Sequence, residues 1–318
     1  MLAALIAIGL VAMPGVASAS ATSVTKIGAW SRDWTWFDAA VGPVDVYRGY
    51  DSGFHYPTWQ QVPRSLAHPG GMNDYSFQLP PSAVASGADD AILNTFIAST
   101  PKNIVLTNYH EPEQEIEKGL FTFAQFRAAE ARLHMLVQAQ NAIDGGTRKV
   151  SVVLMISTFT GFKGRNAENY WPTVAKGDGG TVDLISADVY AAPHATGTAG
   201  VPIGYTDGVN WKDPAVLMRS AIKFAQQHAT DWAVSELGYL EDVNNPTRKA
   251  DALTAAVAAA IAGKPTAKTT YRPALWISYW DSKGGRADWE LRYNNPPVPS
   301  TSATSNAAVA WRNLVNAP

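Results

Sequence analysis

The sequence predicts a single-domain (β/α)8 TIM barrel, and two observations carry this prediction. Eight short β-like runs follow one another along the chain, and several of them are nearly continuous in apolar residues. Such runs are typical of parallel strands that are covered on both faces. Helix-like stretches lie between the runs, and we find no internal repeat or interdomain linker. This alternation of strand and helix is the pattern of a (β/α)8 barrel of the α/β class.

A doubly wound open sheet is the alternative fold. It would usually carry a glycine-rich phosphate-binding turn after its first strand. Here the first strand leads into GAWSRD at 28–33, which is not such a turn. We therefore favour the barrel. The predicted strands are 26–30, 44–50, 74–79, 103–110, 149–158, 182–190, 231–239 and 274–281.

Helices are predicted where apolar residues recur at spacings of three and four. The clearest stretch is 121–143, in which Phe126, Leu133 and Val137 follow this period before Asp-Gly-Gly ends it. The stretch 213–229 opens with an Asp cap and a proline at its first helical position. Further helices are predicted at 250–263 and 307–315.

The composition limits the classes of partner. Charged residues make up 16% of the 318 residues, against roughly 25% in average soluble domains. The net charge is −2 and there is no basic block, which argues against nucleic acid and against an anionic membrane surface. The 11 Trp and 12 Tyr suit a surface that stacks on neutral polar ligands. The absence of Cys excludes disulfides and thiolate sites, and we expect no metal and no cofactor.

The first twenty residues have the pattern of a secretory signal peptide. An apolar run, LAALIAIGLVAM, precedes PGVASAS, which has small residues at the Ala-x-Ala spacing, although no basic segment comes before it. A membrane anchor is the alternative, but a run of about 12 apolar residues is too short to span a bilayer. We expect a signal peptide at 1–20, a catalytic barrel at 24–318, and a secreted protein that is free of the membrane after signal removal.

Two glutamates follow strands of the predicted barrel. The stretch NYHEPEQ at 108–114 ends the fourth strand and contains Glu111, and Glu236 lies near the end of the seventh strand. Active sites of this fold lie at the carboxyl ends of the strands. Two carboxyl groups on nearby strands are what glycoside hydrolysis requires, since one protonates the leaving oxygen and the other attacks the anomeric carbon or activates water. Burial beside the second carboxylate would raise the pKa of the acid.

Aromatic and polar residues follow the other strands. Their rings would provide stacking faces for the C–H surfaces of sugars, and a cluster of tryptophans after the first strand is either part of the barrel closure or of distal sugar sites. These residues are Trp30, Trp34, Trp36, Arg48, Tyr50, Asp188, Tyr190, Tyr279, Trp280 and Asp281.

At these positions the sequence resembles the retaining (β/α)8 glycosidases, which carry an acid/base Glu after strand 4 and a nucleophile Glu after strand 7. Most of them have Asn before the acid/base, whereas His-Glu, as at 110–111, is similar to glycoside hydrolase family 26, the β-mannanase family. VSELG at 234–238 resembles the nucleophile strand of that family, and NYWP with VDLISADVY, at 169–190, resembles its strand 6 region. The family often has Arg-Pro shortly before His-Glu, and Thr107 and Asn108 stand there instead.

The resemblance implies a role for each residue. Glu111 would be the acid and then the base, and Glu236 the nucleophile that forms a glycosyl-enzyme ester. His110 would orient Glu236 or contact the sugar, Tyr190 would hydrogen-bond near the nucleophile, and Trp280 would stack under the sugar ring. Weaker candidates for substrate contacts are Tyr109, Arg48 and Asp188. The implied function is endo-hydrolysis of a β-linked polysaccharide or oligosaccharide by a monomer, with β-1,4-mannan first and xylan or β-glucan next.

Two other function classes stay open. A glycan-binding barrel without activity would keep the aromatic rim but lose one carboxylate, and both are present here. A metal hydrolase could use His110, Glu111, Asp188 and His194, but no HExxH helix supports it. Serine-nucleophile hydrolysis has no G-x-S-x-G motif in this sequence.

Overall fold

A computed structural model describes most of the chain downstream of residue 24. The described residues are 25–68, 70–146, 150–157, 166–191, 205–206, 211–264, 268–284, 287–291 and 305–317. The predicted signal peptide at 1–20 and His194 lie outside them. Among these residues, no helix is both long enough and apolar enough to cross a bilayer.

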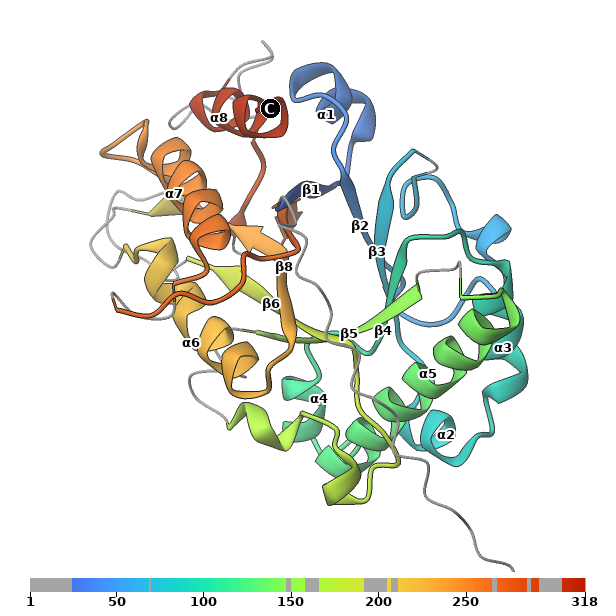
Figure 1. Cartoon of the computed structure of the whole chain (residues 1–318). Helices are drawn as coiled ribbons and strands as arrows, with labels where there is room; N and C mark the ends of the chain where they lie inside the picture. Colours follow the sequence, from blue (N-terminus) through green and yellow to red (C-terminus); the bar gives the residue numbers. More distant parts are fainter. Residues whose placement is uncertain are drawn as a thin grey trace, which may run out of the picture.

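The sheet is a closed barrel of eight parallel strands, which confirms the predicted fold (Figure 1). The strand order around the barrel is β1-β10-β8-β6-β5-β4-β3-β2. Each strand overlaps one of the eight predicted runs, in the predicted order. The strands are β1 (Lys26–Ser31), β2 (Val46–Tyr50), β3 (Met72–Phe77), β4 (Ile104–Asn108), β5 (Val150–Ser157), β6 (Leu184–Tyr190), β8 (Asp231–Gly238) and β10 (Trp276–Asp281).

Helices surround the barrel, and four of them were predicted. These are α5 (Phe123–Ile143), α6 (Pro214–Gln227), α7 (Arg248–Ala262) and α8 (Asn306–Val315). The predicted cap of α6 is confirmed, because the Asp213 side chain accepts a hydrogen bond from the Ala215 amide and Pro214 follows it. Four other helices escaped the sequence analysis: α1 (Trp34–Ala40), α2 (Pro81–Ser86), α3 (Asp90–Ser99) and α4 (Glu113–Glu117).

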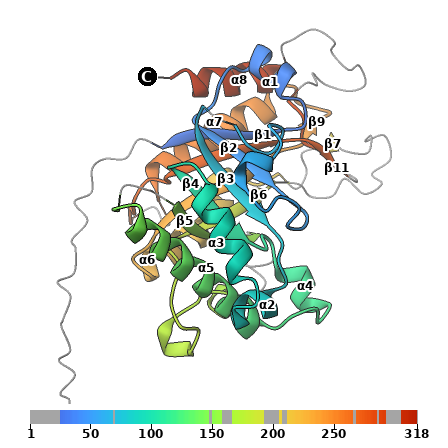
Figure 2. The ribbon, with the colours of Figure 1, turned by 90° about the vertical axis from the view of Figure 1, so that its right-hand side faces the viewer.

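The two ends of the described chain meet where the barrel closes. Strand β1 pairs in parallel with β10, with Lys26 opposite Trp276 and Trp30 opposite Trp280. Helix α8 lies beside α1 in both views of the ribbon, and the Arg312 side chain donates to the carbonyl oxygen of Ala40 (Figures 1 and 2). The last helix therefore covers the seam between the first and the last strand.

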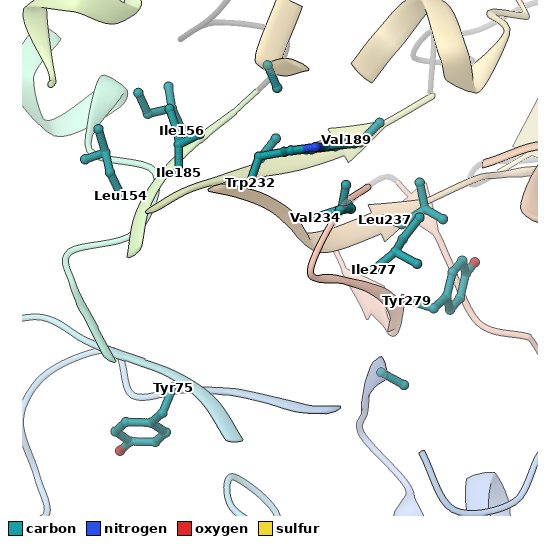
Figure 3. Close-up of a cluster of buried hydrophobic side chains, with 14 of the residues drawn as sticks. Tyr75, Leu154, Ile156, Ile185, Val189, Trp232, Val234, Leu237, Ile277 and Tyr279 are labelled. Atoms are coloured by element: carbon teal, nitrogen blue, oxygen red, sulfur yellow. The ribbon is translucent and has the colours of Figure 1, made fainter. Parts of the chain in front are cut away.

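The core has two layers. Outward-facing side chains of the strands pack under the helices, and Figure 3 shows this layer on β5, β6, β8 and β10. A second cluster fills the barrel itself at the end where the strands begin. Because its members come from strands all around the sheet, they can meet only inside the barrel; they are Val46, Val105, Val153, Met155, Leu184, Ala233 and Trp276. This apolar plug closes one end, so the interior is open to polar groups only toward the carboxyl ends.

Candidate active site

The inward positions of each strand change from apolar to polar toward its carboxyl end. Side chains alternate between the two faces of a strand. On β2, the buried Val46 of the apolar plug is therefore followed on the same face by Arg48 and Tyr50. On β6, Leu184 is followed in the same way by Asp188 and Tyr190. The sequence thus places its ionisable residues inside the barrel, directly above the plug.

Glu236 on β8 is held at both of its carboxylate oxygens. The Nη2 atom of Arg48 lies 3.0 Å from Oε1, and the Tyr190 hydroxyl donates to Oε2 at 2.6 Å. The Glu236 residue is only 5% exposed. Burial raises the pKa of Glu236, and the Arg48 guanidinium and the Tyr190 hydroxyl oppose that rise. The two donors fix the orientation of the carboxylate and favour its ionised form.

Glu111 lies just beyond the end of β4 and has a different environment. Burial, then the charge of Glu236, then that of Glu113, raise the pKa of Glu111 to about 8. Its carboxyl group therefore keeps its proton near neutral pH. The backbone is also unusual here, since Glu111 has a φ of 50° and Tyr109 a φ of 63°. A left-handed backbone conformation is energetically costly for residues other than glycine, and such residues are often found at functional sites. The turn at 109–111 therefore resembles a functional site in its backbone.

His110 stands between these two strained residues. Its Nδ1 atom lies 2.9 Å from the Ser76 hydroxyl oxygen. Its ring packs edge-on against the Tyr50 ring, with ring centroids 5.5 Å apart. Burial and the Arg48 charge lower the pKa of His110 to about 3, so the imidazole is neutral. Ser76, and not Glu236, is its hydrogen-bond partner within the described residues.

Two further carboxyl groups surround Arg48. Asp188 on β6 is paired in register with Glu236, beside a bulge in the sheet, and burial followed by the charges of Glu236 and Glu111 raises its pKa well above the ordinary range. Burial also raises the pKa of Asp74 on β3, and the charge of Arg48 opposes this. One guanidinium thus shares a buried space with four acids, and burial raises the pKa of each of them.

Aromatic rings line the β1 and β10 side of this group. Trp280 on β10 stacks on Trp30 of β1, with ring centroids 4.2 Å apart and planes within 15°. Tyr50 lies against both rings and reaches His110. The sequence analysis could not assign Trp30, Trp34 and Trp36 to barrel closure or to sugar binding. Of these three, Trp30 belongs to this aromatic group.

Several other predicted residues lie elsewhere. Trp34 packs on Tyr47 and Phe37, and Trp36 also packs on Phe37. Tyr109 packs edge-on against Phe121, with ring centroids 4.8 Å apart. Its role as a substrate contact stays a prediction.

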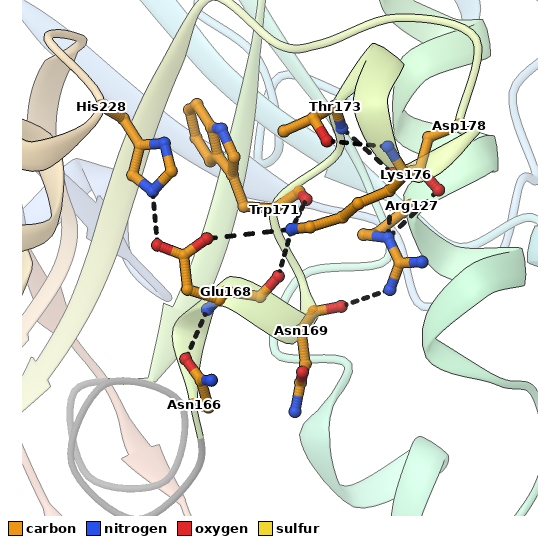
Figure 4. Close-up of polar contacts among 9 residues, drawn as sticks. All are labelled: Arg127, Asn166, Glu168, Asn169, Trp171, Thr173, Lys176, Asp178 and His228. Carbon is orange, nitrogen blue, oxygen red and sulfur yellow. Dashed lines mark hydrogen bonds and ion pairs between the residues drawn. The ribbon is translucent and has the colours of Figure 1, made fainter.

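The NYWP segment has a structural role in the described chain. Lys176 donates to the carbonyl oxygens of Glu168 and Trp171, and His228 lies 2.7 Å from the Glu168 carboxylate (Figure 4). Arg127 of α5 bonds to Asp178 and to the carbonyl oxygen of Asn169. These contacts fasten the segment before β6 to α5 and to the end of α6. They support the strand that carries Asp188 and Tyr190.

Other kinds of site find less support in the described residues. No group of three or more His, Cys, Asp and Glu side chains among them is arranged to hold a metal ion. A cavity of about 560 Å³ opens at the amino ends of β1 to β4, where Lys26, Asp45 and Lys102 line it. It lies at the opposite end of the barrel from Glu111 and Glu236, so it takes no part in their chemistry.

Comparisons with known proteins agree with this geometry at the level of the fold. No family model matches the chain, and no curated protein matches it. The family 26 endo-β-1,4-mannanase of Cellulomonas fimi superposes with a TM-score of 0.52 at 15% identity, over 89% of this chain and 66% of that one. The chain has the fold of these enzymes. It spans just under two thirds of the length of the C. fimi mannanase.

Two more solved structures extend the comparison. The catalytic domain of the family 26 endo-β-1,4-mannanase of Bacillus sp. JAMB-750 has a TM-score of 0.51 at 14% identity, over 87% of this chain and 77% of that one. A triple mutant of an endo-β-1,4-glucanase from Xanthomonas axonopodis pv. citri has a TM-score of 0.55 at 11% identity, over 92% of this chain and all of that one. The similar structures thus include family 26 mannanases and another (β/α)8 glycosidase.

Sequence reasoning missed two residues of this site. Asp74 escaped because the sequence analysis sought candidates at the carboxyl ends of the strands, whereas Asp74 is the third residue of β3. The alternation Met72, Asp74, Ser76 places Asp74 on the inward face. Ser76, the partner of His110, would have followed from the same alternation.

Proposed function

We propose that this chain is a retaining glycoside hydrolase that cleaves a β-linked polysaccharide. The observation that carries the proposal is the pairing of two carboxyl groups in different environments at the carboxyl ends of β4 and β8. Glu236 is held by a cation and a hydroxyl, whereas Glu111 is kept protonated by burial and by Glu236 itself. A carboxylate beside a carboxylic acid is what this reaction requires.

The first step forms a covalent intermediate. Glu111 gives its proton to the glycosidic oxygen as the bond from that oxygen to the anomeric carbon breaks. A Glu236 oxygen attacks the anomeric carbon from the opposite face and forms a glycosyl ester, while the shortened glycan leaves as an alcohol. Tyr190 holds Oε2 before the attack, so the carboxylate reaches the carbon in one orientation.

The second step uses the electrostatic coupling between the two glutamates. In the ester Glu236 has no charge, so one of the causes that raise the pKa of Glu111 disappears. Glu111, now ionised, accepts a proton from water as the water oxygen attacks the anomeric carbon. The ester bond breaks, Glu236 leaves as a carboxylate, and the sugar is released with its original configuration.

The substrate proposed first is β-1,4-mannan, cleaved within the chain, with xylan and β-glucan next. Supporting this order are the His-Glu pair at 110–111 and the similarity in fold to endo-mannanases and an endo-glucanase. The low charge of the chain and its aromatic group suit a neutral polymer. Export through a signal peptide at 1–20 and a monomeric state belong to the same proposal.

The test is the release of reducing ends from a panel of mannans, galactomannan, xylans and β-glucans. We expect release from one class by the native protein and none by Glu236→Ala. Proton NMR of the first product will give the configuration, and a β-anomer formed first supports retention. Binding to one glycan without release would instead indicate a glycan-binding barrel.

A further inference from the structure

A tryptophan that the proposed mechanism does not use lies over the Tyr190 side of Glu236. Trp289 follows the short strand β12 (Ala287–Asp288), and its ring lies 4.9 Å from that of Tyr190, centroid to centroid. Trp289 is partly exposed to solvent. Since Tyr190 donates to Glu236, the Trp289 ring is one residue removed from the proposed nucleophile.

Gly238 provides the space for these two rings. A Cβ at this position would lie 2.5 Å from Cδ1 of Tyr190 and 3.0 Å from Cε3 of Trp289. Any larger residue at the end of β8 would therefore displace one ring or the other. The glycine, two residues after Glu236, is explained by the packing of Tyr190 and Trp289 over the strand.

A buried lysine binds the backbone of Trp289. Lys249 of α7 is 0% exposed, and its Nζ atom donates to the carbonyl oxygens of Trp289 at 3.3 Å and Glu290 at 2.7 Å. Its ion-pair partner is Glu241, 3.4 Å away. The Tyr279 hydroxyl donates to the same Trp289 carbonyl oxygen, and the Trp289 amide donates to Ser282.

Buried polar groups thus fix the backbone of a partly exposed tryptophan. A buried ammonium group is costly unless it is fully hydrogen-bonded. Here two contacts of the ammonium group go to the backbone carbonyls of the turn at 289–290 and a third goes to Glu241. An anchored and partly exposed aromatic ring suits sugar stacking, because it loses little conformational entropy on binding.

We infer that Trp289 forms a second aromatic wall of a glycan-binding site, and that it stacks on a sugar ring of a β-linked oligosaccharide bound across Glu236. The strand order supports this, since β8 lies between β10 and β6. Trp280 lies on β10, and Tyr190, on which the Trp289 ring packs, lies on β6. The inference rests on the proposed function for the kind of ligand, but it concerns binding and is separable from catalysis.

Binding is measured by calorimetry in the full chain carrying Glu111→Gln, so that no ligand is consumed. The probes are β-1,4-linked mannohexaose, xylohexaose and cellohexaose. We expect one of them to bind, Trp289→Ala to weaken that binding about tenfold, and Trp289→Phe to restore most of it. Trp36→Ala, which removes a partly exposed indole outside the site, is the matched control and leaves the affinity unchanged. Thermal melting shows whether each variant folds.

A spectroscopic readout separates stacking from a structural effect. The hexaose that binds should quench the tryptophan fluorescence of the parent more than that of Trp289→Phe. Lys249→Met keeps the indole but frees its backbone, and it should weaken binding by a smaller factor than Trp289→Ala.

The outcomes distinguish the inference from the proposed function. Cleavage by the native protein with equal hexaose affinity in Trp289→Ala overturns the inference and leaves the glycosidase standing. Hexaose binding that depends on Trp289, without cleavage by the native protein, supports the aromatic wall and overturns the enzyme. If no hexaose binds and no glycan is cleaved, both are overturned.

Discussion

The guanidinium of Arg48 lies 3.0 Å from the Glu236 carboxylate, and both side chains are buried inside the barrel. The resemblance to family 26 places an arginine shortly before His-Glu on strand 4, where this chain has Thr107 and Asn108. In this chain the guanidinium beside Glu236 comes from Arg48 of strand β2.

Arg48→Met should lower kcat by a factor on the order of 10²–10³, because the nucleophile loses the cation that favours its charged form. The lower limb of the pH profile of kcat/KM should move to higher pH, since the pKa of Glu236 rises without Arg48. Removing one partner of a buried pair also costs about 3–5 kcal/mol of unfolding free energy. Urea unfolding and steady-state kinetics measure these effects.

The control for this variant is Arg32→Met, which removes an exposed arginine just after β1. It should leave the pH profile and the unfolding midpoint unchanged. A lower limb that stays in place in Arg48→Met would mean that Arg48 does not set the charge of Glu236.

The roles of the two glutamates can be told apart with azide. On an aryl glycoside with a good leaving group, Glu236→Ala should be inactive until azide attacks from the vacated side, which gives a glycosyl azide of inverted configuration. Glu111→Ala should still form the ester, and azide should then give a product of retained configuration. NMR of the two azides reads out the assignment. Exchanged configurations would reverse the roles of Glu111 and Glu236.

The pH dependence of the reaction should report Glu111. The acid must be protonated, and its pKa is raised to about 8, so kcat/KM should fall as pH rises through about 8. His110, with its pKa lowered to about 3, is neutral over the working range and should contribute no limb there.

A Glu236→Gln variant tests the cause of the raised pKa. Glutamine removes the negative charge, so the pKa of Glu111 should fall, and carbon-13 NMR of the Glu111 carboxyl group measures it directly. An unchanged pKa would mean that burial and the other nearby carboxylates hold the proton without Glu236. The proposed switch of Glu111 from acid to base would then lack its electrostatic driving force.

The barrel fold and the positions of the two glutamates could be predicted from the sequence for a physical reason. Parallel strands that are buried on both faces read as apolar runs, and a Glu within or just after such a run is conspicuous. The site residues that the sequence analysis missed depend on the register of a strand or on contacts between distant parts of the chain. Asp74 was missed because it lies before the end of its strand, where no candidate was sought. Trp289 contacts Tyr190 from a turn about 100 residues away, which no local pattern encodes.

The short helices escaped for a different reason. Helix α2 has six residues and α4 has five, too few for an amphipathic period to become visible. The local signals of α2 were the proline at its first position and the glycine, Gly87, that ends it. Such helices are fixed by packing against the barrel and not by their own sequence.

Glu130 of α5 offers a test of the core that is independent of the function. Its carboxyl group is completely buried, and neither oxygen has a hydrogen-bond partner among the described residues. Burial raises its pKa well above 4.5, so the folded state keeps a proton that the unfolded chain releases. Its contribution to stability therefore declines as pH rises above about 4.5.

Glu130→Met should raise the unfolding free energy at pH 7 by about 1–3 kcal/mol, because an apolar side chain of similar length replaces a buried polar group without partners. The gain should shrink toward pH 4, where the unfolded chain also holds the proton. Urea unfolding from pH 4 to pH 8 measures both effects, and Glu130→Gln, which stays polar and buried, should gain less than Glu130→Met. A loss of stability in Glu130→Met at every pH would show that the carboxyl group makes a favourable interaction in the folded protein.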